Sequence, residues 1–383
     1  MIRVGFLLAS PPGAWLGGAN YMRSLVEAIR ALPDRSIEPV LFVSRRRVAD
    51  WKGYFPDLPM VATSLVDHWT LPWFSRKLLR ACSGREILLE RLLVRNGISL
   101  YSHGAGLGKG AKLKTLGWIP DFQHLHLPEF FTSEICRQRD ANFRTICLTC
   151  DAVVVSSEDV QKDLIGFCPQ AASRVRVLRF VPQVPSIDSL PSRSELEARY
   201  GFEGPFFHLP NQFWKHKNHR VVIEALSILR QSGSPGLVLA TGNAKDFRNP
   251  QFFDSLMAMV RHRGLERDFR PLGVVPFTDI LALMHQASAV LNPSMFEGWS
   301  TTVEEAKCLG ARVILSDIPV HREQAPAGAL YFPPQDAELL SAHMKRVLEG
   351  AGLGEIPARS TETAYRNFGL AYEQIVMDLL RAT

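Results

Sequence analysis

Short apolar runs alternate with amphipathic stretches along most of the chain, and this alternation predicts the fold class. Residues 2–9 (IRVGFLLA) form an apolar run that predicts a buried parallel strand, and the stretch from Asn20 to Leu32 has the apolar spacing of a helix. Further strands are predicted at residues 38–43, 98–102, 115–119, 152–156 and 175–179. Because strands alternate with helices, the pattern predicts βαβ units and a parallel sheet.

A Pro- and Ser-rich stretch at residues 180–195 interrupts the alternation, which then starts again. The second half has predicted strands at 205–209, 236–241, 269–275, 288–292 and 312–316, and predicted helices at about 218–230, 251–263, 278–286, 302–309 and 363–381. The pattern predicts two doubly wound α/β domains in tandem, residues 1–183 and 201–362, joined by a linker at 184–200. A length of 383 residues fits two domains. Ligands of such sheets bind at the carboxyl ends of the strands, so the expected site is a cleft between two facing sheets.

The charge of the chain indicates what kind of partner it binds, and its cysteine content indicates its cellular compartment. The chain has 44 Lys and Arg against 38 Asp and Glu, a net charge of +6, which favours anionic ligands or an anionic membrane surface. This excess is too small and too dispersed to indicate nucleic-acid binding. Six cysteines, most among apolar neighbours, indicate a reduced cytoplasmic protein, and the Cys147–Cys150 pair is expected to be buried rather than metal-bound. No apolar stretch approaches the ~20 residues of a membrane span, so neither secretion nor membrane spanning is expected.

The segment 291–323 carries the most informative carboxylates, Glu297 and Glu305. The pattern predicts a strand, a loop with Glu297, a helix with Glu305 in its first turn, and a second strand. The helix N-terminus near Ser300–Thr302 has free N–H groups that suit a diphosphate, and the two carboxylates are then expected to accept hydrogen bonds from sugar hydroxyls. The alternative for Glu305 is a capping box with Thr302, in which it only caps the helix.

The segment 206–220 carries a cluster of basic side chains at the start of a predicted helix, with Asn218 as the predicted N-cap. The cluster comprises Lys215, His216, Lys217, His219 and Arg220. The helix macrodipole disfavours a cation at this end by ~0.3–1 kcal/mol, and a bound anion would remove the conflict. Lys217 is therefore a candidate phosphate ligand. The alternative is a solvated basic turn.

Two segments of the first half place glycines or polar residues after a predicted strand. A turn with Gly13, Gly17 and Gly18 suits a ligand close to the backbone, or is simply a tight turn. After the strand at 115–119, four polar residues are candidates for acid–base chemistry or for binding hydroxyls: Asp121, His124, His126 and Glu129. A His-x-His metal site is the alternative there, but no third ligand is defined, and the chain has no Asp-x-Asp to chelate a metal ion.

These segments resemble the retaining glycosyltransferases of family 4, which have the GT-B fold, and the resemblance covers nearly the whole chain. Its most specific part is PSMFEGWSTTVEEAKCLGARVILSD, which is similar to the family's donor signature of two Glu separated by seven residues. The resemblance implies that Glu297 lies near the donor sugar and that Glu305 contacts the ribose of the nucleotide. It also implies donor binding by the residues between them, with the distal phosphate on the backbone amides of the last three: Gly298, Trp299, Ser300, Thr301 and Thr302.

The segment NQFWKHKNH resembles the family's loop that sets an Arg and a Lys against the diphosphate. Lys217 matches the Lys, whereas Gln212 stands where the Arg is usual, so Lys215 or His216 is expected to compensate for the lost charge.

The first half also resembles the family. Gly17 and Gly18 resemble its glycine turn, which adds them to the expected donor-binding residues. Family members often have His-Asp where this chain has Pro120 and Asp121, so His124 is the substitute for the missing His. The last helix, predicted to extend over residues 363–383, resembles the family's carboxyl-terminal helix and is expected to pack back on the first domain.

The resemblance implies a reaction. A nucleoside-diphosphate sugar, UDP- or GDP-linked, would bind mainly to the second domain, and a hydroxyl of a glycan or lipid-linked acceptor would attack its anomeric carbon with retention. Lys217 and helix amides would stabilise the leaving diphosphate, and neither a metal ion nor another cofactor is expected. The catalytic candidates are Glu297, Lys217, His124 and Asp121.

Two alternative functions stay open: a nucleotide-sugar epimerase-type enzyme of the same architecture, and a catalytically inactive protein that binds a sugar nucleotide or a glycan. Members of the family often touch a membrane. Residues 69–95 mix aromatic with basic side chains, namely Trp69, Trp73, Phe74, Arg76, Lys77, Arg80 and Arg85. This composition is typical of a helix lying on an anionic bilayer, so a cytoplasmic protein bound peripherally to the inner face of the membrane is expected; an ordinary surface helix is the alternative.

Overall fold

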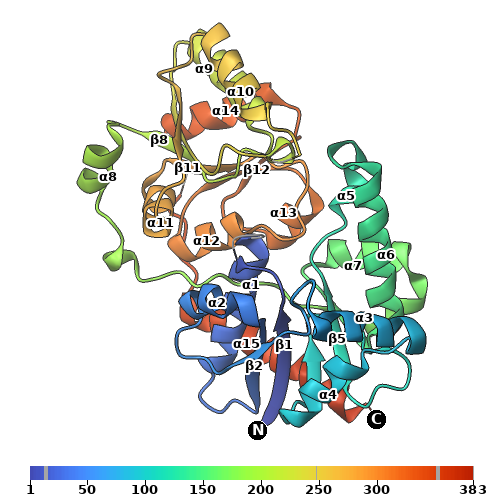
Figure 1. Ribbon diagram of the computed structural model, residues 1–383. Coiled ribbons are helices and arrows are strands. Elements are labelled where there is room, and N and C mark those ends of the chain that lie inside the picture. Colours follow the sequence, from blue (N-terminus) through green and yellow to red (C-terminus); the bar gives the residue numbers. More distant parts are fainter. Residues whose placement is uncertain (13–15, 247, 351–353, 383) are drawn as a thin grey trace. The chain divides into compact units, whose positions relative to one another are not determined.

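The computed structural model describes residues 1–12, 16–246, 248–350 and 354–382, and it divides into two compact units (Figure 1). The first unit comprises residues 1–122, residues 133–182 and the segment from Glu362, and the second comprises residues 123–132 and 183–361. Each unit is an α/β structure on one parallel sheet, which is the fold class that the hydrophobic pattern predicts.

The first unit is built on a seven-stranded sheet in the order β3-β2-β1-β4-β5-β6-β7. The strands are β1 (Ile2–Leu8), β2 (Ile37–Ser44), β3 (Met60–Thr63), β4 (Leu100–Ser102), β5 (Lys114–Ile119), β6 (Ala152–Val155) and β7 (Val175–Val177). All neighbours pair in parallel, and β6 is buried along its whole length because helices cover both faces of the sheet. Cys147 and Cys150 lie buried in the core beside β6, as expected.

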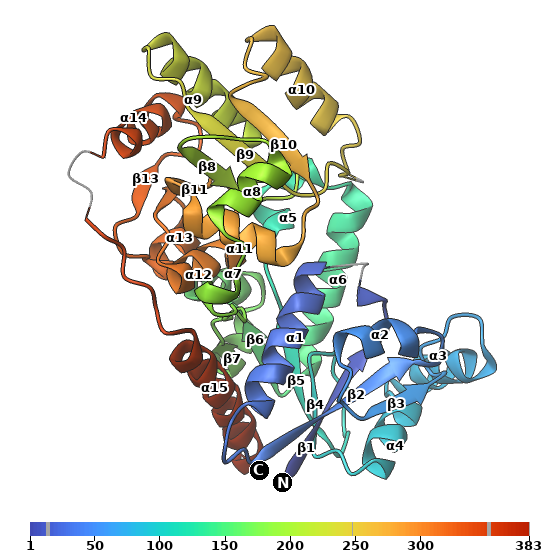
Figure 2. The same cartoon turned by 90° about the vertical axis from the view of Figure 1, so that its left-hand side faces the viewer.

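The helices of the first unit include the last helix of the chain. They are α1 (Leu16–Arg30), α2 (Val48–Tyr54), α3 (Leu71–Ser83), α4 (Ile87–Arg95), α6 (Ser133–Thr149), α7 (Glu158–Phe167) and α15 (Thr361–Arg381). The Tyr365 hydroxyl of α15 donates to the Ser24 carbonyl of α1 at 2.9 Å, and the buried Tyr372 hydroxyl donates to Ser102 Oγ of β4 at 2.7 Å. Figure 2 shows the dark red α15 beside these first elements of the chain.

The glycine turn before the first helix is not where the sequence places it. Gly17 and Gly18 lie inside the first turn of α1, with Gly18 buried and Gly17 exposed, and Gly13 lies outside the described residues. The helix begins at Leu16 rather than at Asn20, and its buried side already includes Gly18 and Ala19. The two glycines therefore offer first-turn N–H groups rather than a turn.

The second unit is built on a six-stranded sheet in the order β10-β9-β8-β11-β12-β13. Its strands are β8 (Phe206–Leu209), β9 (Leu237–Thr241), β10 (Phe269–Gly273), β11 (Ala289–Asn292), β12 (Val313–Ser316) and β13 (Leu330–Phe332). Its helices are α5 (Gln123–His126), α8 (Arg193–Tyr200), α9 (His219–Gln231), α10 (Phe252–His262), α11 (Phe277–Gln286), α12 (Thr301–Leu309), α13 (Pro319–Gln324) and α14 (Ala337–Leu348). The strand order reverses between β8 and β11, and this switch point is where open parallel sheets bind ligands.

The stretch expected as a linker is partly helical. Helix α8 begins with a capping box: the Ser192 side chain accepts from the Glu195 N–H, and the Glu195 side chain accepts from the Ser192 N–H. The helix ends at Gly201, whose φ is 62°. Leu196 is fully buried in a cluster with Phe202 and Phe206, and Val184 joins the core beneath α11 and α12. Residues 183–200 are thus packed parts of the second unit. Among the described residues, no helix combines the length and the apolar character needed to cross a membrane.

Candidate functional site

The loops that follow β8 and β11 meet at the switch point of the second sheet. Lys217 ends a short 3-10 turn after β8, and Asn218 follows it in the left-handed conformation at φ 57°. Asn218 occupies the predicted N-cap position of α9, but its side chain does not cap the helix. It donates instead to the carbonyls of Pro293 at 3.1 Å and Pro334 at 2.6 Å, which ties the Lys217 loop to the loop after β11.

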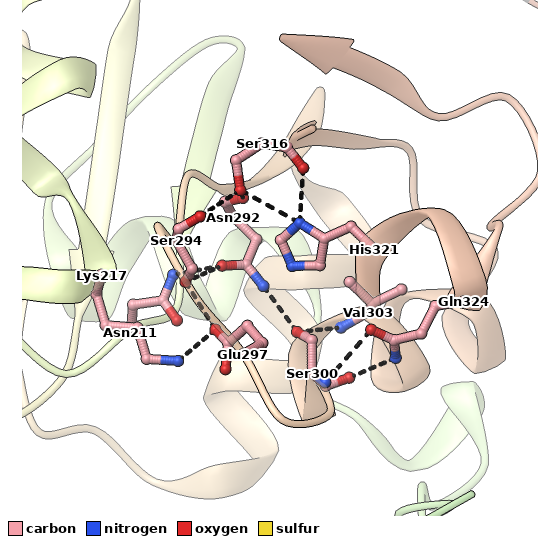
Figure 3. A network of polar contacts seen from close by, with 10 residues as sticks. All are labelled: Asn211, Lys217, Asn292, Ser294, Glu297, Ser300, Val303, Ser316, His321 and Gln324. Carbon is pink, nitrogen blue, oxygen red and sulfur yellow. Dashed lines mark hydrogen bonds and ion pairs between the residues drawn. The ribbon is translucent and has the colours of Figure 1, made fainter. Parts of the chain in front are cut away.

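Lys217 and Glu297, each selected from a different segment of the sequence, form an ion pair in the structure (Figure 3). Lys217 Nζ donates to Glu297 Oε1 at 2.5 Å, and the two side chains are 15% and 10% exposed. Ser294 Oγ lies 2.7 Å from the same carboxylate oxygen. Among the described residues, no partner contacts Glu297 Oε2, so this oxygen is available to a ligand.

The loop that carries Glu297 is closed at its base by buried polar contacts. Asn292 Nδ2 donates to Ser300 Oγ at 2.7 Å, which joins the two ends of the loop. Gln324 of α13 accepts from the Ser300 N–H at 3.3 Å and donates to the Ser300 carbonyl at 2.8 Å. Gly298 and Trp299, both half-buried, complete the loop before α12. These contacts hold the loop that carries the carboxylate, and Figure 3 shows those of Asn292, Ser300 and Gln324.

Glu305 is not part of a capping box. The N-cap of α12 is Ser300, whose Oγ accepts from the Val303 N–H, and Thr302 lies inside the helix. Glu305 is buried at 7% exposure and has no hydrogen-bond or ion-pair partner among the described residues, whereas its neighbour Glu304 is paired with Arg359 at 2.7 Å. Burial raises the pKa of Glu305 to about 8. A carboxyl group in this state lacks the polar partners that buried charges normally have.

The start of α12 also leaves backbone donors unused. The N–H groups of Thr301 and Thr302 have no acceptor within the described parts of the chain. Ser300 differs from the sequence expectation, since its N–H is occupied by Gln324 and its hydroxyl by the cap. The two free N–H groups and the positive end of the helix dipole stand one turn from Glu305 and suit an anionic group.

Gln212 and His216 do not provide a second cation beside Lys217, and Lys215 lies over an aromatic ring. Gln212 Oε1 accepts from the Asn243 N–H at 2.7 Å, and the Lys215 ammonium lies over the Phe130 ring, 4.9 Å from its centre. His216 is buried, and burial together with nearby Lys217 holds its pKa well below the usual range, so its ring is neutral at pH 7. His216 therefore does not replace the charge lost at Gln212, whereas Lys215 is exposed, keeps its charge and remains the candidate.

The structure places Asp121 and His124 in different units, and Asp121 is paired with Arg139 at 2.5 Å. His124 is buried in α5, and the His126 ring lies 4.9 Å from the ring of Phe296. No group of three or more His, Cys, Asp or Glu side chains that could hold a metal ion occurs in the described ranges. The His-x-His pair thus finds no third ligand there.

Sequence reasoning missed His103, which stands after β4 at the switch point of the first sheet. Its backbone is left-handed at φ 59°, and its ring nitrogens lie 2.8 Å from both Tyr21 Oη and Ser102 Oγ. Removal of the ring from solvent lowers the pKa of His103 to about 3. The available signal was a histidine directly after a short apolar strand.

Comparisons with known proteins identify a matching family model and similar sequences. Residues 197–367 match the family model described as glycosyl transferases group 1, and this range contains Lys217, Glu297 and Glu305. The chain is 31% identical over 134 residues to the O-antigen chain mannosyltransferase RfbU of Salmonella typhimurium, and 30% identical over 103 residues to the O-antigen chain mannosyltransferase B of Escherichia coli. The aligned segments span 36% and 27% of those relatives.

Solved structures share the fold over nearly the whole chain. A glycosyltransferase from Rickettsia africae covers 99% of this chain and is itself covered to 97%, with a TM-score of 0.66 at 14% identity. Anabaena HepE in complex with UDP-glucose has a TM-score of 0.69 at 15% identity, with 99% of both chains covered. WaaG, a glycosyltransferase involved in lipopolysaccharide biosynthesis, has a TM-score of 0.61 at 14% identity, with 97% of this chain and 95% of WaaG covered. The two Rossmann-like sheets are therefore those of the GT-B fold.

Proposed function

We propose that this chain, whose residues 197–367 belong to the glycosyl transferases group 1 family, is a retaining glycosyltransferase. Its donor is a UDP- or GDP-linked sugar, and its acceptor is a hydroxyl of a glycan or a lipid-linked glycan in polysaccharide or glycoconjugate synthesis. The observation that carries the proposal is Glu305, a buried carboxyl without a partner beside two unused helix N–H groups and the Lys217–Glu297 pair.

Each part of a nucleotide sugar has a matching group in this site. The ribose hydroxyls donate to Glu305, and this supplies the hydrogen bonds that its buried oxygens lack. The diphosphate accepts from the N–H groups of Thr301 and Thr302 and attracts the Lys217 ammonium. The sugar hydroxyls donate to the free Oε2 of Glu297. The base lies outside this set of contacts.

The proposed reaction uses these groups. The bond between the anomeric carbon and the diphosphate oxygen breaks, and the acceptor oxygen forms a bond to that carbon on the same face. The acceptor proton passes to an oxygen of the departing diphosphate, so no protein nucleophile is needed. Lys217 and the first turn of α12 stabilise the charge that develops on the leaving group, without calling on a metal ion. Asp121 and His124 are the remaining catalytic candidates, and Gly17 and Gly18 of α1 are further candidates for binding the donor.

A binding panel tests the donor class. The protein is melted with UDP, GDP, ADP and TDP and with their common sugar conjugates; mannosyl and glucosyl conjugates are tested first, because the relatives are mannosyltransferases and HepE is solved with UDP-glucose. A ligand at 100 times its dissociation constant adds ~2.7 kcal/mol of stability, a clear rise in melting temperature. Glu305→Ala should abolish the rise, and the exposed Glu266→Ala should retain it.

The outcomes separate the proposal from its alternatives. One nucleotide class that stabilises the wild type, with sugar transfer to an added glycan, supports the glycosyltransferase. Conversion of the sugar without any acceptor supports an epimerase-type enzyme, and binding without turnover supports an inactive binding protein. No stabilisation by any of the compounds would refute the donor site.

We further propose that the enzyme binds an anionic membrane surface through α3. None of the residues of α3 is buried, and the apolar side chains around it are strongly exposed: Trp69 77%, Leu71 82%, Phe74 48% and Leu78 67%. Leu71, Phe74 and Leu78 share one helix face by their spacing. Arg46 donates to the His68 carbonyl at 3.3 Å, which places this cation beside Trp69, and Arg45 and Arg47 are exposed on the same short turn. An apolar face next to clustered cations fits an anionic bilayer.

The basic residues that the sequence suggested are poor targets for testing membrane binding, because several of them form ion pairs within the fold. Arg76 and Arg80 both bind Glu86, at 2.6 and 2.8 Å, and Arg85 binds Glu90 at 2.8 Å, so these side chains support the fold. Leu71→Asp with Leu78→Asp should abolish sedimentation with vesicles of phosphatidylcholine and phosphatidylglycerol. Val94→Asp with Leu148→Asp, also exposed in the first unit, is the matched control. Unchanged sedimentation of the first variant would refute the membrane surface.

A further inference from the structure

We propose that Ser294 is a positioning residue whose hydroxyl takes over the hydrogen bond to Glu297 when Lys217 turns to the diphosphate of the donor. This inference rests on the proposed function of the site. Ser294 has no exposed surface, so its hydroxyl acts on Glu297 and does not touch the substrate.

The Ser294 hydroxyl has two acceptors and one proton. Its Oγ lies 2.7 Å from Glu297 Oε1 and 2.8 Å from Asn292 Oδ1, and a hydroxyl donates one hydrogen bond at a time. Figure 3 shows Ser294 between these two groups. While Lys217 Nζ occupies Glu297 Oε1 at 2.5 Å, the carboxylate has a strong donor without Ser294. The Ser294 hydroxyl can then donate its hydrogen bond to Asn292 Oδ1.

Binding of the donor changes which hydrogen-bond donors are available to Glu297 Oε1. A diphosphate carries more charge than one carboxylate and draws the Lys217 ammonium toward itself. Among the described residues, Ser294 is then the remaining donor within reach of Glu297 Oε1. Its proton turns from Asn292 to the carboxylate, where a hydrogen bond to a charged acceptor is the stronger of the two. Asn292 Oδ1 keeps a donor, because Asn211 Nδ2 lies 3.3 Å from it.

The backbone around Ser294 holds the hydroxyl at a fixed point. The Ser294 carbonyl accepts from Ser316 Oγ at 2.5 Å, and the carbonyl of Pro293 accepts from Asn218 Nδ2 at 3.1 Å. Rotation about one side-chain bond is therefore the only movement required. The result is that Glu297 Oε1 stays bound to protein throughout the cycle, and Oε2 stays directed at the sugar.

The test separates positioning from folding by a matched pair of buried serines. Ser157 is equally buried, but it lies in the first unit, where its hydroxyl oxygen accepts from the Val160 N–H at the start of α7. The nucleoside diphosphate that stabilises the wild type is used for calorimetric binding, and kcat and KM are measured with its sugar conjugate. Ser294→Ala should bind the diphosphate within about twofold of wild type and lose kcat by about 10- to 100-fold, since one charge-assisted hydrogen bond is worth about 1.5–3 kcal/mol.

Two further variants complete the design. Ser294→Cys is close to serine in size but is a weaker donor, so it should lose kcat even where Ser294→Ala fails to fold. Ser294→Thr retains the hydroxyl and should restore most of the activity. Ser157→Ala should lower the melting temperature, because a helix cap is lost, and should leave kcat near that of the wild type.

The results distinguish this inference from the function on which it rests. Full kcat in Ser294→Ala or Ser294→Cys, or an equal loss of kcat in Ser157→Ala, overturns the role of Ser294 and leaves the glycosyltransferase in place. A wild type that neither binds any nucleoside diphosphate nor turns over any sugar conjugate overturns both proposals.

Discussion

Burial of Glu305 without a partner links the binding site to the stability of the fold. The pKa of its carboxyl rises from 4.5 to about 8, so the folded state holds a proton that the unfolded chain has already lost above its ordinary pKa. Folding therefore takes up a proton between about pH 4.5 and about pH 8, and this residue makes the fold less stable as the pH rises through that window.

Glu305→Gln should remove this dependence. The glutamine side chain is uncharged, so the variant should gain stability relative to wild type as the pH increases from 5 to 8, by at least about 1 kcal/mol across the range. Urea unfolding at both pH values measures the difference, and the exposed Glu266→Gln serves as the control. The variant should also lose most of the stabilisation by nucleotide. A difference between variant and wild type that does not vary with pH would contradict the raised pKa.

Glu297→Gln should affect the same ligand in the opposite direction. The ion pair with Glu297 neutralises Lys217 before the ligand arrives, so replacing the carboxylate with an amide frees the ammonium for the diphosphate. Calorimetry should find a nucleoside diphosphate bound about three- to tenfold more tightly, an effect of about 0.7–1.4 kcal/mol, while sugar transfer falls. Equal or weaker binding would mean that Lys217 is not the cation that meets the diphosphate.

Sequence reasoning could find Lys217, Glu297 and Glu305 because charged residues after apolar strands are conspicuous. Their pairing was not visible, since the two residues of the ion pair are 80 positions apart and only the strand order β8-β11 brings them together. Ser294 was missed for a different reason. A small polar residue next to a buried strand has no distinct pattern, and its role depends on hydrogen bonds that only the fold defines.

At the scale of elements, long buried strands were easier to predict than short helices and short edge strands. The longer buried runs, such as β1 and β9, stand out as continuous apolar segments. The strands β3 and β13 were missed, because each has three or four residues, is only partly buried and lies at a sheet edge. Helix α8 was missed because the Pro- and Ser-rich composition of its surroundings indicates a linker, whereas Ser192 and Glu195 form a helix start.

Ser192→Ala tests whether α8 contributes to the second unit. Loss of the cap removes the acceptor for the Glu195 N–H and should lower the free energy of unfolding by about 1 kcal/mol. Ser189→Ala, whose hydroxyl binds the Ser186 carbonyl outside the helix, is the control. Chemical denaturation of both variants gives the comparison. If the two variants lose equal stability, residues 193–200 behave as a tether rather than as part of the packed unit.

At the scale of the whole molecule, the chain does not fold as two consecutive halves. Its last helix, α15, packs in the first unit, where Phe368, Tyr372 and Val376 are buried. The expectation that the final helix packs back therefore agrees with the contacts of Tyr365 and Tyr372. The first unit is complete only when α15 has been made, whereas Lys217, Glu297 and Glu305 of the proposed donor site all belong to the second unit.

A substitution at Gly369 of α15 can measure how strongly the first unit depends on this helix. A Cβ atom there would lie 2.7 Å from the Ala28 carbonyl oxygen of α1, so Gly369→Ala forces the two helix backbones apart. The cost should be about 1–3 kcal/mol and should fall on the first unit alone, because the units can open separately. Hydrogen exchange should show faster exchange in α1, β4 and α15, with α12 and β11 unchanged and nucleotide binding preserved.

Gly166→Ala on α7, where nothing lies within 4 Å of the added methyl, is the control and should leave exchange unaltered. Equal loss of protection in both units would mean that they unfold together, and the donor site would then depend on the last helix of the chain.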